Sequence, residues 1–446
     1  MRRFRNSPAV TAFYWLFVGL SIAVCIVLLR QHLPQYLPHD WVNAHEGDAL
    51  ADWKAARLYP LDVSPYKPTG LAMVGAPMGH PPTTVFWYLP MVDFAKPLAA
   101  ELTSLILWFL IIPHIYMCAK VLKWPAPMAW TALLTSLIFS TSWFRYHFDV
   151  IQFSELIAFW YLLAWLFLRS GRDSLAGICI GLAATIKFFP GAMILMLVVA
   201  RRWRAVFWAG ATFTLIAVMM TSAFGIESWR EYAELQKPIV DVWYGSGQSS
   251  SISGLLNQIR SPFCESGHNP AHTSTPTLAS ITAALLFISA LWASRRELKR
   301  ARLEHGVSID LPFALFALLS VFSNAWVWEH YYVLAIQPLF VVTTEFVRLA
   351  RLAYRRWSDM ETSNFKFVFQ ALGLVLVCAA LSLVVLALSR HTWSPFWYID
   401  VWKATQSPKF HAFAHFDLAL KVVPWVVSIT LCFVALRATR KFTPGS

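Results

Sequence analysis

The sequence predicts an all-α protein that crosses a membrane many times, and two observations carry this prediction. Apolar residues make up 57% of the 446 residues, whereas charged residues make up only 14%. Soluble domains are closer to about 45–50% apolar and about 25% charged. Runs of roughly 20 apolar residues recur along the chain, and each is long enough to cross a hydrocarbon core of about 30 Å as a helix. An integral membrane protein is therefore expected.

The net charge of +13 has a membrane explanation rather than a nucleic-acid one. Positive residues next to spans stay on the cytoplasmic side, where anionic lipid headgroups are their counter-charges. The Lys and Arg residues gather in short clusters beside apolar runs, at 169–172, 201–204, 295–302, 348–356 and 437–441. We therefore expect membrane lipids as partners and no nucleic acid.

Placing the basic clusters on the cytoplasmic side fixes the path of the chain. The first apolar run follows a basic segment and has no small-residue cleavage site after it, which indicates an uncleaved anchor. The predicted spans are 10–29, 100–120, 126–144, 153–168, 205–224, 276–293, 310–327, 331–347, 366–388 and 418–436. Both termini are then cytoplasmic, and residues 1–446 form one integral domain of the cell (inner) membrane. The external loops at 30–98, 225–275 and 390–417 are too short for an independent soluble domain.

The interval 175–200 is one apolar run with basic clusters at both ends. A single crossing would place the cluster 201–204 outside. Two short helices that turn near Lys187 and Pro190 keep both clusters inside, and they raise the count to about twelve spans. Non-helical backbone at that depth is tolerated only against protein or a water-filled cavity. One long tilted helix with a proline kink is the alternative.

The first external loop, 30–98, carries acidic residues between the first two spans and is expected to hold juxtamembrane helices. Asp48 and Asp52 are four residues apart, so on a helix they share a face. A carboxylate at a membrane surface with apolar and aromatic neighbours can become a useful general base. The alternative is an acid that caps a helix or pairs with Lys54 or Arg57.

Lys187 is the second candidate. Ionisable groups within spans are costly and usually face a cavity or a partner. An ammonium group at a hairpin tip could bind a phosphate that arrives from the lipid. A lysine that reaches the interface, or one that is buried in an ion pair, is the alternative.

Two tight external turns bring further polar groups to the outer face. One turn contains Arg145, His147 and Gln152, and the other contains Trp328 and His330. So many polar groups in short turns indicate the wall of a shared cavity. A hydrogen-bonded interfacial cap of Trp, Tyr and His is the alternative.

The loop 225–275 includes a Gly- and Ser-rich stretch with Gln248. Its hydroxyl and amide groups match sugar hydroxyls, so we expect this loop to bind the acceptor or the donor. Gly/Ser loops are also ordinary linkers.

The chain lacks sequence patterns for nucleotide chemistry. It has no Walker-type phosphate loop, no GxGxxG entering a soluble domain and no DxD-like pair within a cytosolic domain. Its six cysteines follow no disulfide or metal spacing. A donor should therefore come from the membrane, with no cofactor and no metal implied.

Four stretches resemble glycosyltransferase family 87, the GT-C-fold mannosyltransferases that depend on polyprenyl-phosphate-mannose. The first is Asp52-Trp-Lys-Ala-Ala56 followed by Ser64-Pro-Tyr66, and the second, Phe86-Trp-Tyr-Leu-Pro90, resembles the family's F-x-Y-P-P element. The third, from Gly177 through Gly181 to Lys187 and Pro190, is similar to its G-x-x-x-G-L-A…K-x-x-P hairpin. Trp328-Glu-His330-Tyr331 is similar to its W-x-H-H/Y turn.

Two stretches depart from the family pattern. Where the family often has Gly-Gln-x-Asn, this chain has Ile151-Gln152-Phe153-Ser154, so one amide is lost. The second proline of F-x-Y-P-P is Met91.

The resemblance implies a GT-C fold and an inverting transfer of a sugar, with mannose expected, from a polyprenyl-phosphate donor to a lipid or glycan acceptor. Asp52 would be the catalytic base. The donor phosphate is expected to meet Lys187, Arg145 and His330. The substrate-binding residues are expected to be Asp48, Tyr66, Gln152, His147, Gln248 and Trp328. The active site would be extracytoplasmic.

Two other functions share some of these features. A lipid or glycolipid transporter or flippase would also need a polar cavity, but it forms no covalent product and usually shows related halves, which are not seen here. A non-catalytic scaffold would leave Asp52, Lys187 and His330 unexplained.

Overall fold

A computed structural model describes part of the chain, and every regular element in that part is a helix. The described residues are 15–16, 18–20, 22–23, 26–27, 48–58, 61, 63–67, 80–139, 153–244, 251–260, 275–303, 306–324, 327, 329–355 and 425–437. The helices are α2 (Asp48–Leu58), α4 (Pro82–Val85), η2 (Phe86–Met91), α5 (Lys96–Val121), α6 (Pro127–Phe139), α8 (Ser154–Arg169), α9 (Asp173–Ile186), η3 (Phe189–Ala192), α10 (Met193–Val199), α11 (Trp203–Phe224), α12 (Glu227–Tyr244), α13 (Ile252–Arg260), α14 (Thr275–Leu303), η4 (Val307–Ile309), α15 (Asp310–Phe322), η5 (Glu329–Ala335) and α16 (Ile336–Arg355). One more helix covers Trp425–Arg437. The all-α prediction is confirmed for these residues.

Four helices in the described part of the chain are long and apolar enough to cross a membrane. They cover Glu101–Val121, Trp203–Phe224, Pro276–Arg302 and Tyr331–Leu349. Shorter apolar helices cover Asp173–Ile186, Phe189–Val199, Asp310–Phe322 and Trp425–Arg437. This set indicates an integral membrane protein. The count of about twelve spans stays a prediction, because the predicted span 366–388 and most of 10–29 lie outside the described residues.

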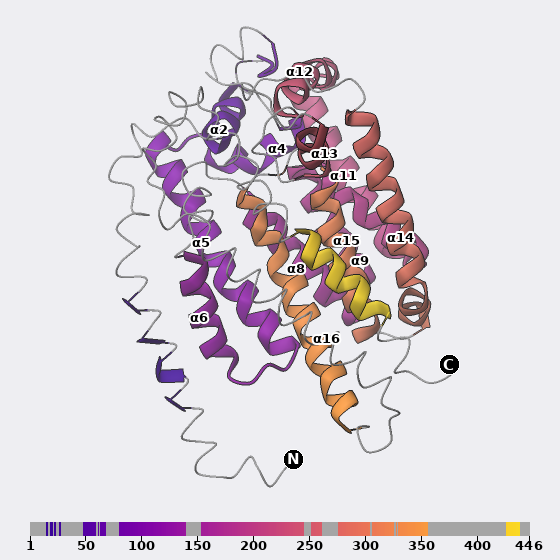
Figure 1. Ribbon diagram of the computed structural model, residues 1–446. Coiled ribbons are helices and arrows are strands. Elements are labelled where there is room, and N and C mark those ends of the chain that lie inside the picture. Colours follow the sequence, from indigo (N-terminus) through magenta and orange to yellow (C-terminus); the bar gives the residue numbers. More distant parts are fainter. Residues whose placement is uncertain are drawn as a thin grey trace, which may run out of the picture.

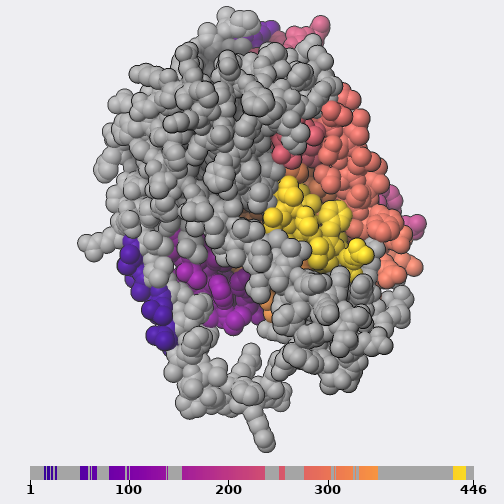
Figure 2. Space-filling model, in the orientation of Figure 1, coloured from indigo at the N-terminus to yellow at the C-terminus, as the bar shows by residue number. Residues whose placement is uncertain are grey.

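The outer side of α14 carries a stripe of apolar side chains. Ile281, Leu285, Ile288 and Trp292 are between 51% and 61% exposed and follow one face of the helix. On the face drawn in Figure 2, α14 forms one flank of the molecule. Soluble monomers rarely expose such a continuous apolar surface. The stripe therefore fits contact with lipid tails.

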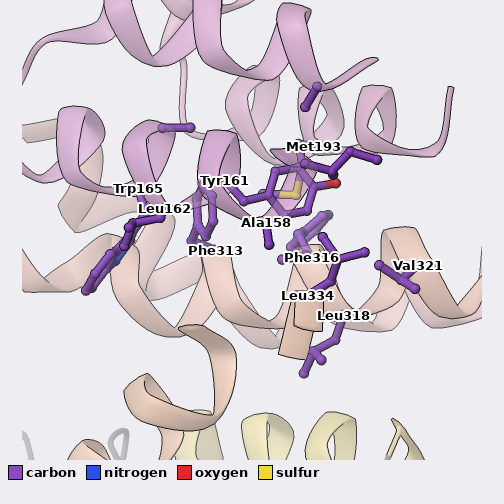
Figure 3. Close-up of a cluster of buried hydrophobic side chains, with 14 of the residues drawn as sticks. Ala158, Tyr161, Leu162, Trp165, Met193, Phe313, Phe316, Leu318, Val321 and Leu334 are labelled. Carbon is purple, nitrogen blue, oxygen red and sulfur yellow. The ribbon is translucent and has the colours of Figure 1, made fainter. Parts of the chain in front are cut away.

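α15 lies at the centre of the bundle, and every residue from Asp310 to Phe322 is buried. A helix that is apolar on all sides needs partners on all sides. α8 supplies one of them: the ring edge of Tyr161 packs on Phe313, and its hydroxyl lies 2.9 Å from the Ser320 hydroxyl. Figure 3 shows Tyr161 and Phe313 in this cluster of buried side chains.

The apolar run 175–200 folds back on itself. α9 ends at Ile186, Lys187 has extended backbone angles (φ −147°, ψ 147°), and the chain continues through η3 into α10. Arg202, just beyond α10, lies 3.3 Å from the carboxylate of Asp173 at the start of α9. One continuous helix would separate these two residues by about 44 Å at about 1.5 Å per residue. Both ends of the run therefore lie on the same side of the bundle, as the hairpin prediction requires and the long-helix alternative does not allow.

Two glycines let α9 and α11 approach closely. A Cβ atom at Gly177 would collide with the backbone of Ala205, and one at Gly181 would lie 2.7 Å from the carbonyl oxygen of Ala209. Small residues four apart on one helix face are typical of close helix pairs in membranes. The glycines of the Gly177–Gly181 motif thus fix the first arm of the hairpin against α11.

Charged side chains are buried where α8, α9, α11, α14 and α15 meet, and we call this the basic end. Nη1 of Arg202 contacts both carboxylate oxygens of Asp173, at 3.3 and 3.4 Å, and Nη2 donates to the backbone carbonyl of Ala301. Asp310 accepts a hydrogen bond from Trp165 at 2.8 Å and lies 3.2 Å from Arg169. These guanidinium–carboxylate contacts join helix ends that are far apart in the chain.

Short helices gather at the other end of the bundle, which we call the loop end. Figure 1 shows α2, α4, α12 and α13 together there. α9 connects the two ends: it begins at Asp173 and ends at Ile186, whose carbonyl accepts a hydrogen bond from Thr84 in α4. The helices expected in the first external loop are present as α2, α4 and η2.

Several helix boundaries differ from the predicted spans: α15, for instance, ends at Phe322 rather than at 327. α14 continues through the basic cluster to Leu303, because lysine and arginine are good helix formers and basic residues suit the C-terminal end of the helix dipole. The span predicted at 331–347 starts as the 3₁₀ helix η5, and α16 begins only at Ile336. Pro338 then falls in the first turn of α16, where a missing N–H costs nothing.

Candidate active site

Asp52 lies in the middle of α2 and is only 2% exposed. α2 is fixed by its neighbour Trp53, whose indole N–H donates to the carbonyl of Met91 in η2 at 2.9 Å. The guanidinium of Arg57 lies over the same indole ring, 4.9 Å from its centre. These contacts turn one face of α2 towards the protein, and Asp52 lies on that face. A buried carboxylate needs a hydrogen-bonding partner.

His80 is that partner. Its Nδ1 lies 2.8 Å from Oδ2 of Asp52, and the two side chains are 13% and 3% exposed. An ionised carboxylate can only accept hydrogen bonds, so Nδ1 carries the hydrogen. No sequence pattern predicts the role of His80, because the residue stands 28 positions after Asp52 and no spacing rule connects them.

Tyr66 supports the pair from the other side. Its hydroxyl donates to the backbone carbonyl of His80 at 3.0 Å, and its ring meets the ring of Tyr232 edge-on at 5.6 Å. Burial raises the pKa of the Tyr66 phenol well above its usual value, and the negative charge of Asp52 and then Tyr232 add to the effect. Tyr66 therefore stays a neutral hydrogen-bond donor beside Asp52.

α12 holds the segment that carries Tyr66. Glu231 accepts a hydrogen bond from the Ser64 hydroxyl at 2.6 Å and lies 3.4 Å from the ammonium group of Lys67. Burial raises the pKa of the Tyr232 phenol, so this side chain is neutral as well. α12, within the segment predicted to be external, thus contributes directly to the surroundings of Asp52.

Lys187 stands at the tip of the hairpin and is 8% exposed. Its Nζ donates to the hydroxyl of Tyr331 at 2.6 Å and lies 4.5 Å from the centre of the same ring. Phe189 meets the Tyr331 ring edge-on at 5.6 Å. Lys187 is extended rather than helical because Pro190 follows three residues later and ends α9. The contacts place a cation among aromatic rings at the loop end.

Two connections join the surroundings of Asp52 to the hairpin tip. In the first, α4 and η2 bind the end of α9: Thr84 donates to the carbonyl of Ile186 at 2.7 Å, and the indole of Trp87 donates to Thr185 at 3.1 Å. In the second, Phe188 contacts the ring of Tyr232 at 6.1 Å. Asp52 and Lys187, distant in sequence, therefore belong to one packed assembly at the loop end.

The other predicted site residues are only partly described. The backbone of Asp48 lies in α2 and that of His330 in η5, whereas their side chains lie outside the described part of the chain. Arg145, His147, Gln152, Gln248 and Trp328 lie outside it altogether. Their roles stay predictions.

The described residues include no group of three His, Cys, Asp or Glu side chains that could hold a metal ion. The Asp52–His80 pair supplies two such groups. What this end of the bundle offers chemically is a buried carboxylate with a fixed hydrogen bond, neutral phenols and an ammonium group.

Comparison with known proteins identifies the chain. A sequence model described as glycosyltransferase family 87 matches residues 79–311, which is more than half of the 446 residues. The match includes His80 and Lys187, whereas Asp52 and Tyr66 precede it and His330 follows it. A search of curated proteins gives no match. The resemblance carried by the motifs is confirmed: the chain belongs to glycosyltransferase family 87 and is a membrane glycosyltransferase.

Proposed function

We propose that the protein transfers a sugar, with mannose as the expected one, from a polyprenyl-phosphate donor to a hydroxyl group of a lipid or glycan acceptor, with inversion at the anomeric carbon. The observation that carries the proposal is the buried carboxylate of Asp52, held at the loop end of the same assembly as Lys187. Family membership supports the class of reaction. The donor, the acceptor and the residue roles are the proposal.

Asp52 acts as the general base. The acceptor oxygen forms a bond to the anomeric carbon as its proton moves to the carboxylate. The bond between that carbon and the lipid phosphate oxygen breaks, and the electron pair leaves with polyprenyl phosphate. Attack from the face opposite the phosphate converts a β-linked donor into an α-glycoside.

Lys187 stabilises the negative charge that develops on the departing phosphate. A fixed cation in a site shielded from water is most effective where charge appears in the transition state. Lys187 is held in place by Tyr331 and is largely buried, which supports this role. Arg145 and His330 are proposed to assist at the phosphate. Holding the base, the donor and the acceptor in one fixed geometry lowers the activation barrier further.

The remaining substrate contacts are assigned to the loops. Tyr66 contacts the surroundings of the base, which supports its placement beside the acceptor. Asp48, Gln152, His147, Gln248 and Trp328 are proposed as further substrate-binding residues. We treat 1–446 as one domain, with 30–98 as the loop that carries the base and 225–275 as the loop that binds acceptor or donor.

We place the active site on the extracytoplasmic side of the cell (inner) membrane, with both termini cytoplasmic. Arg169 and Arg202 lie at the opposite end of α9 from Lys187. Positive residues beside spans favour the cytoplasmic side. The arrangement of charge along the bundle therefore supports this orientation.

A transfer assay tests the proposal. The purified protein is incubated with radiolabelled polyprenyl-phosphate-mannose and total membrane lipid, and a new labelled glycolipid is expected. Asp52→Asn should lower turnover by about 10²–10⁴-fold, the usual contribution of a general base, while donor binding is kept. Asp93→Asn is the matched control, because Asp93 is an exposed aspartate of the same loop.

Two outcomes would contradict the proposal. Near-normal turnover by Asp52→Asn would remove the base assignment. Movement of the labelled donor across a vesicle membrane without any new glycolipid would point to a flippase instead.

A further inference from the structure

We propose that His80 is a positioning residue for the base: its Nδ1–H holds one oxygen of Asp52 so that the carboxylate meets the acceptor hydroxyl in one orientation. The inference rests on the proposed role of Asp52 as the base. Its starting observation is the 2.8 Å contact between His80 Nδ1 and Asp52 Oδ2 within a nearly buried pair.

His80 is itself held on two sides. Its backbone carbonyl accepts the hydrogen bond from Tyr66 at 3.0 Å. Pro81, the next residue, has a restricted extended backbone (φ −68°, ψ 160°), and Pro82 begins α4. The backbone that carries the His80 ring is restricted on both sides, so the ring cannot easily move with Asp52. The ring can therefore fix the orientation of the Asp52 carboxylate.

The segment that holds His80 in place is also connected to the hairpin. α4 follows directly after Pro81, and its Thr84 donates to the carbonyl of Ile186, the residue before Lys187. The short helix α4 thus links the position of Asp52, the proposed base, to that of Lys187, the proposed phosphate-binding cation. Errors of about 1 Å in such a distance can cost about 10²-fold in rate.

The type of partner fits a base rather than a structural carboxylate. At the basic end, Asp173 is bound by Arg202, whose guanidinium group is always charged. A permanent positive charge next to a carboxylate makes it a poorer proton acceptor. An imidazole can donate the same hydrogen bond while neutral. His80 therefore orients Asp52 without permanently cancelling its charge.

Three substitutions at one position test the inference. In His80→Asn the amide nitrogen can take the place of Nδ1, whereas in His80→Gln it falls near the place of Nε2. His80→Ala removes both. We expect His80→Ala and His80→Gln to lower kcat by about 10²-fold, with donor KM changed far less, and His80→Asn to recover most of the loss.

The readouts separate positioning from a purely structural role. Each variant is purified in detergent, its melting temperature is measured, and kcat and donor KM are determined at saturating acceptor lipid. A structural role would lower the amount of folded protein and the melting temperature, and it would leave kcat per folded molecule unchanged. The double variant Asp52→Asn/His80→Ala should be no slower than Asp52→Asn alone, because a positioning residue acts only through the base.

Three results would overturn the inference. The first is wild-type kcat in His80→Ala, and the second is an equal loss in Asn, Gln and Ala variants, which would make the ring itself the proton acceptor. The third is a double variant much slower than Asp52→Asn. If Asp52→Asn remained active, the proposed function would fail as well. If Asp52→Asn were inactive and His80→Ala normal, the inference about His80 alone would fail.

Discussion

Carboxylates that are largely buried have different binding partners at the two ends of the bundle. At the basic end, Asp173 and Asp310 are bound by the guanidinium groups of Arg202 and Arg169. At the loop end, Asp52 is bound by the imidazole of His80 and lies beside the neutral phenol of Tyr66. All three acids are largely shielded from water, so burial alone does not distinguish them. The partner does.

The difference indicates what each end is for. A guanidinium–carboxylate contact ties two helix ends together, and removing one partner leaves the other without its counter-charge. The imidazole–carboxylate contact instead joins Asp52 in α2 to the segment that leads into α4. The basic end therefore holds helices together, and the loop end carries the carboxylate that we propose as the base. Substitutions at the two ends should separate activity from stability.

After Asp52 itself, the largest effect on activity is expected at Lys187. Lys187→Met keeps the length of the side chain but removes the cation proposed to stabilise the leaving phosphate. Transfer should fall by about 10²–10³-fold, as for the loss of one transition-state charge contact. The rate of glycolipid formation per folded molecule measures this.

Arg230→Met is the control for charge at the loop end, since the Arg230 side chain is 74% exposed. It should keep nearly full activity. Equal losses in both variants would mean that general positive charge, rather than Lys187 itself, supports transfer.

Arg202→Met should show the opposite behaviour. It leaves the carboxylate of Asp173 and the carbonyl of Ala301 without their guanidinium contacts. Breaking a buried pair costs about 3–5 kcal/mol, so the free energy of unfolding should fall by about 3 kcal/mol, while activity per folded molecule changes little. Denaturant titration in detergent, followed by tryptophan fluorescence, measures the loss.

Arg204→Met provides the comparison, because Arg204 belongs to the same cluster and is exposed. Its unfolding free energy should match that of the wild type. A loss as large as that of Arg202→Met would refute the structural role assigned to the buried pair.

Gly177→Ala tests the hairpin between the two ends. The added methyl group meets the backbone of Ala205, which cannot move aside as a flexible side chain would. Overpacking of this kind costs about 1–3 kcal/mol. Gly210→Ala, in α11 with open space around its Cβ position, should instead stabilise the helix by roughly 0.5–1 kcal/mol. The two melting temperatures should move in opposite directions, and a shared direction would contradict the close contact of α9 and α11.

The smallest effect is expected at an exposed pair on α12. Arg230 and Glu234 lie 3.1 Å apart, but their side chains are 74% and 68% exposed. Arg230→Ala should change the unfolding free energy by no more than about 0.5 kcal/mol. A change near that of Arg202→Met would show that ion-pair geometry, rather than burial, sets the stability of this protein.

Local sequence signals predicted much of the architecture. Apolar runs located the helices, since a span needs about 20 apolar residues whatever surrounds it. Lys187 and Pro190 within a run flanked by basic clusters predicted the turn of the hairpin, which α9 and α10 form. Helices were also expected in the loop 30–98, and α2 lies there and contains both Asp48 and Asp52.

Contacts between distant segments could not be predicted in this way. Tyr66 and Tyr232 meet although they belong to different loops, and Lys187 meets Tyr331 from another turn 144 positions away. His80 gave no signal because a single histidine in a loop has no period and no motif. The same applies to Arg202, which looked like one more member of a cytoplasmic cluster.

The sequence by itself determined the membrane class, the helical fold, the turn at Lys187 and the family, because composition, apolar length and short motifs are local properties. Only the tertiary structure decided which histidine or arginine side chain binds each aspartate. Asp52 and Asp310 are the same residue type, and each lies in or at the start of a helix. Their difference depends on the side chain that packing brings within hydrogen-bonding distance, and that choice is made by the whole chain.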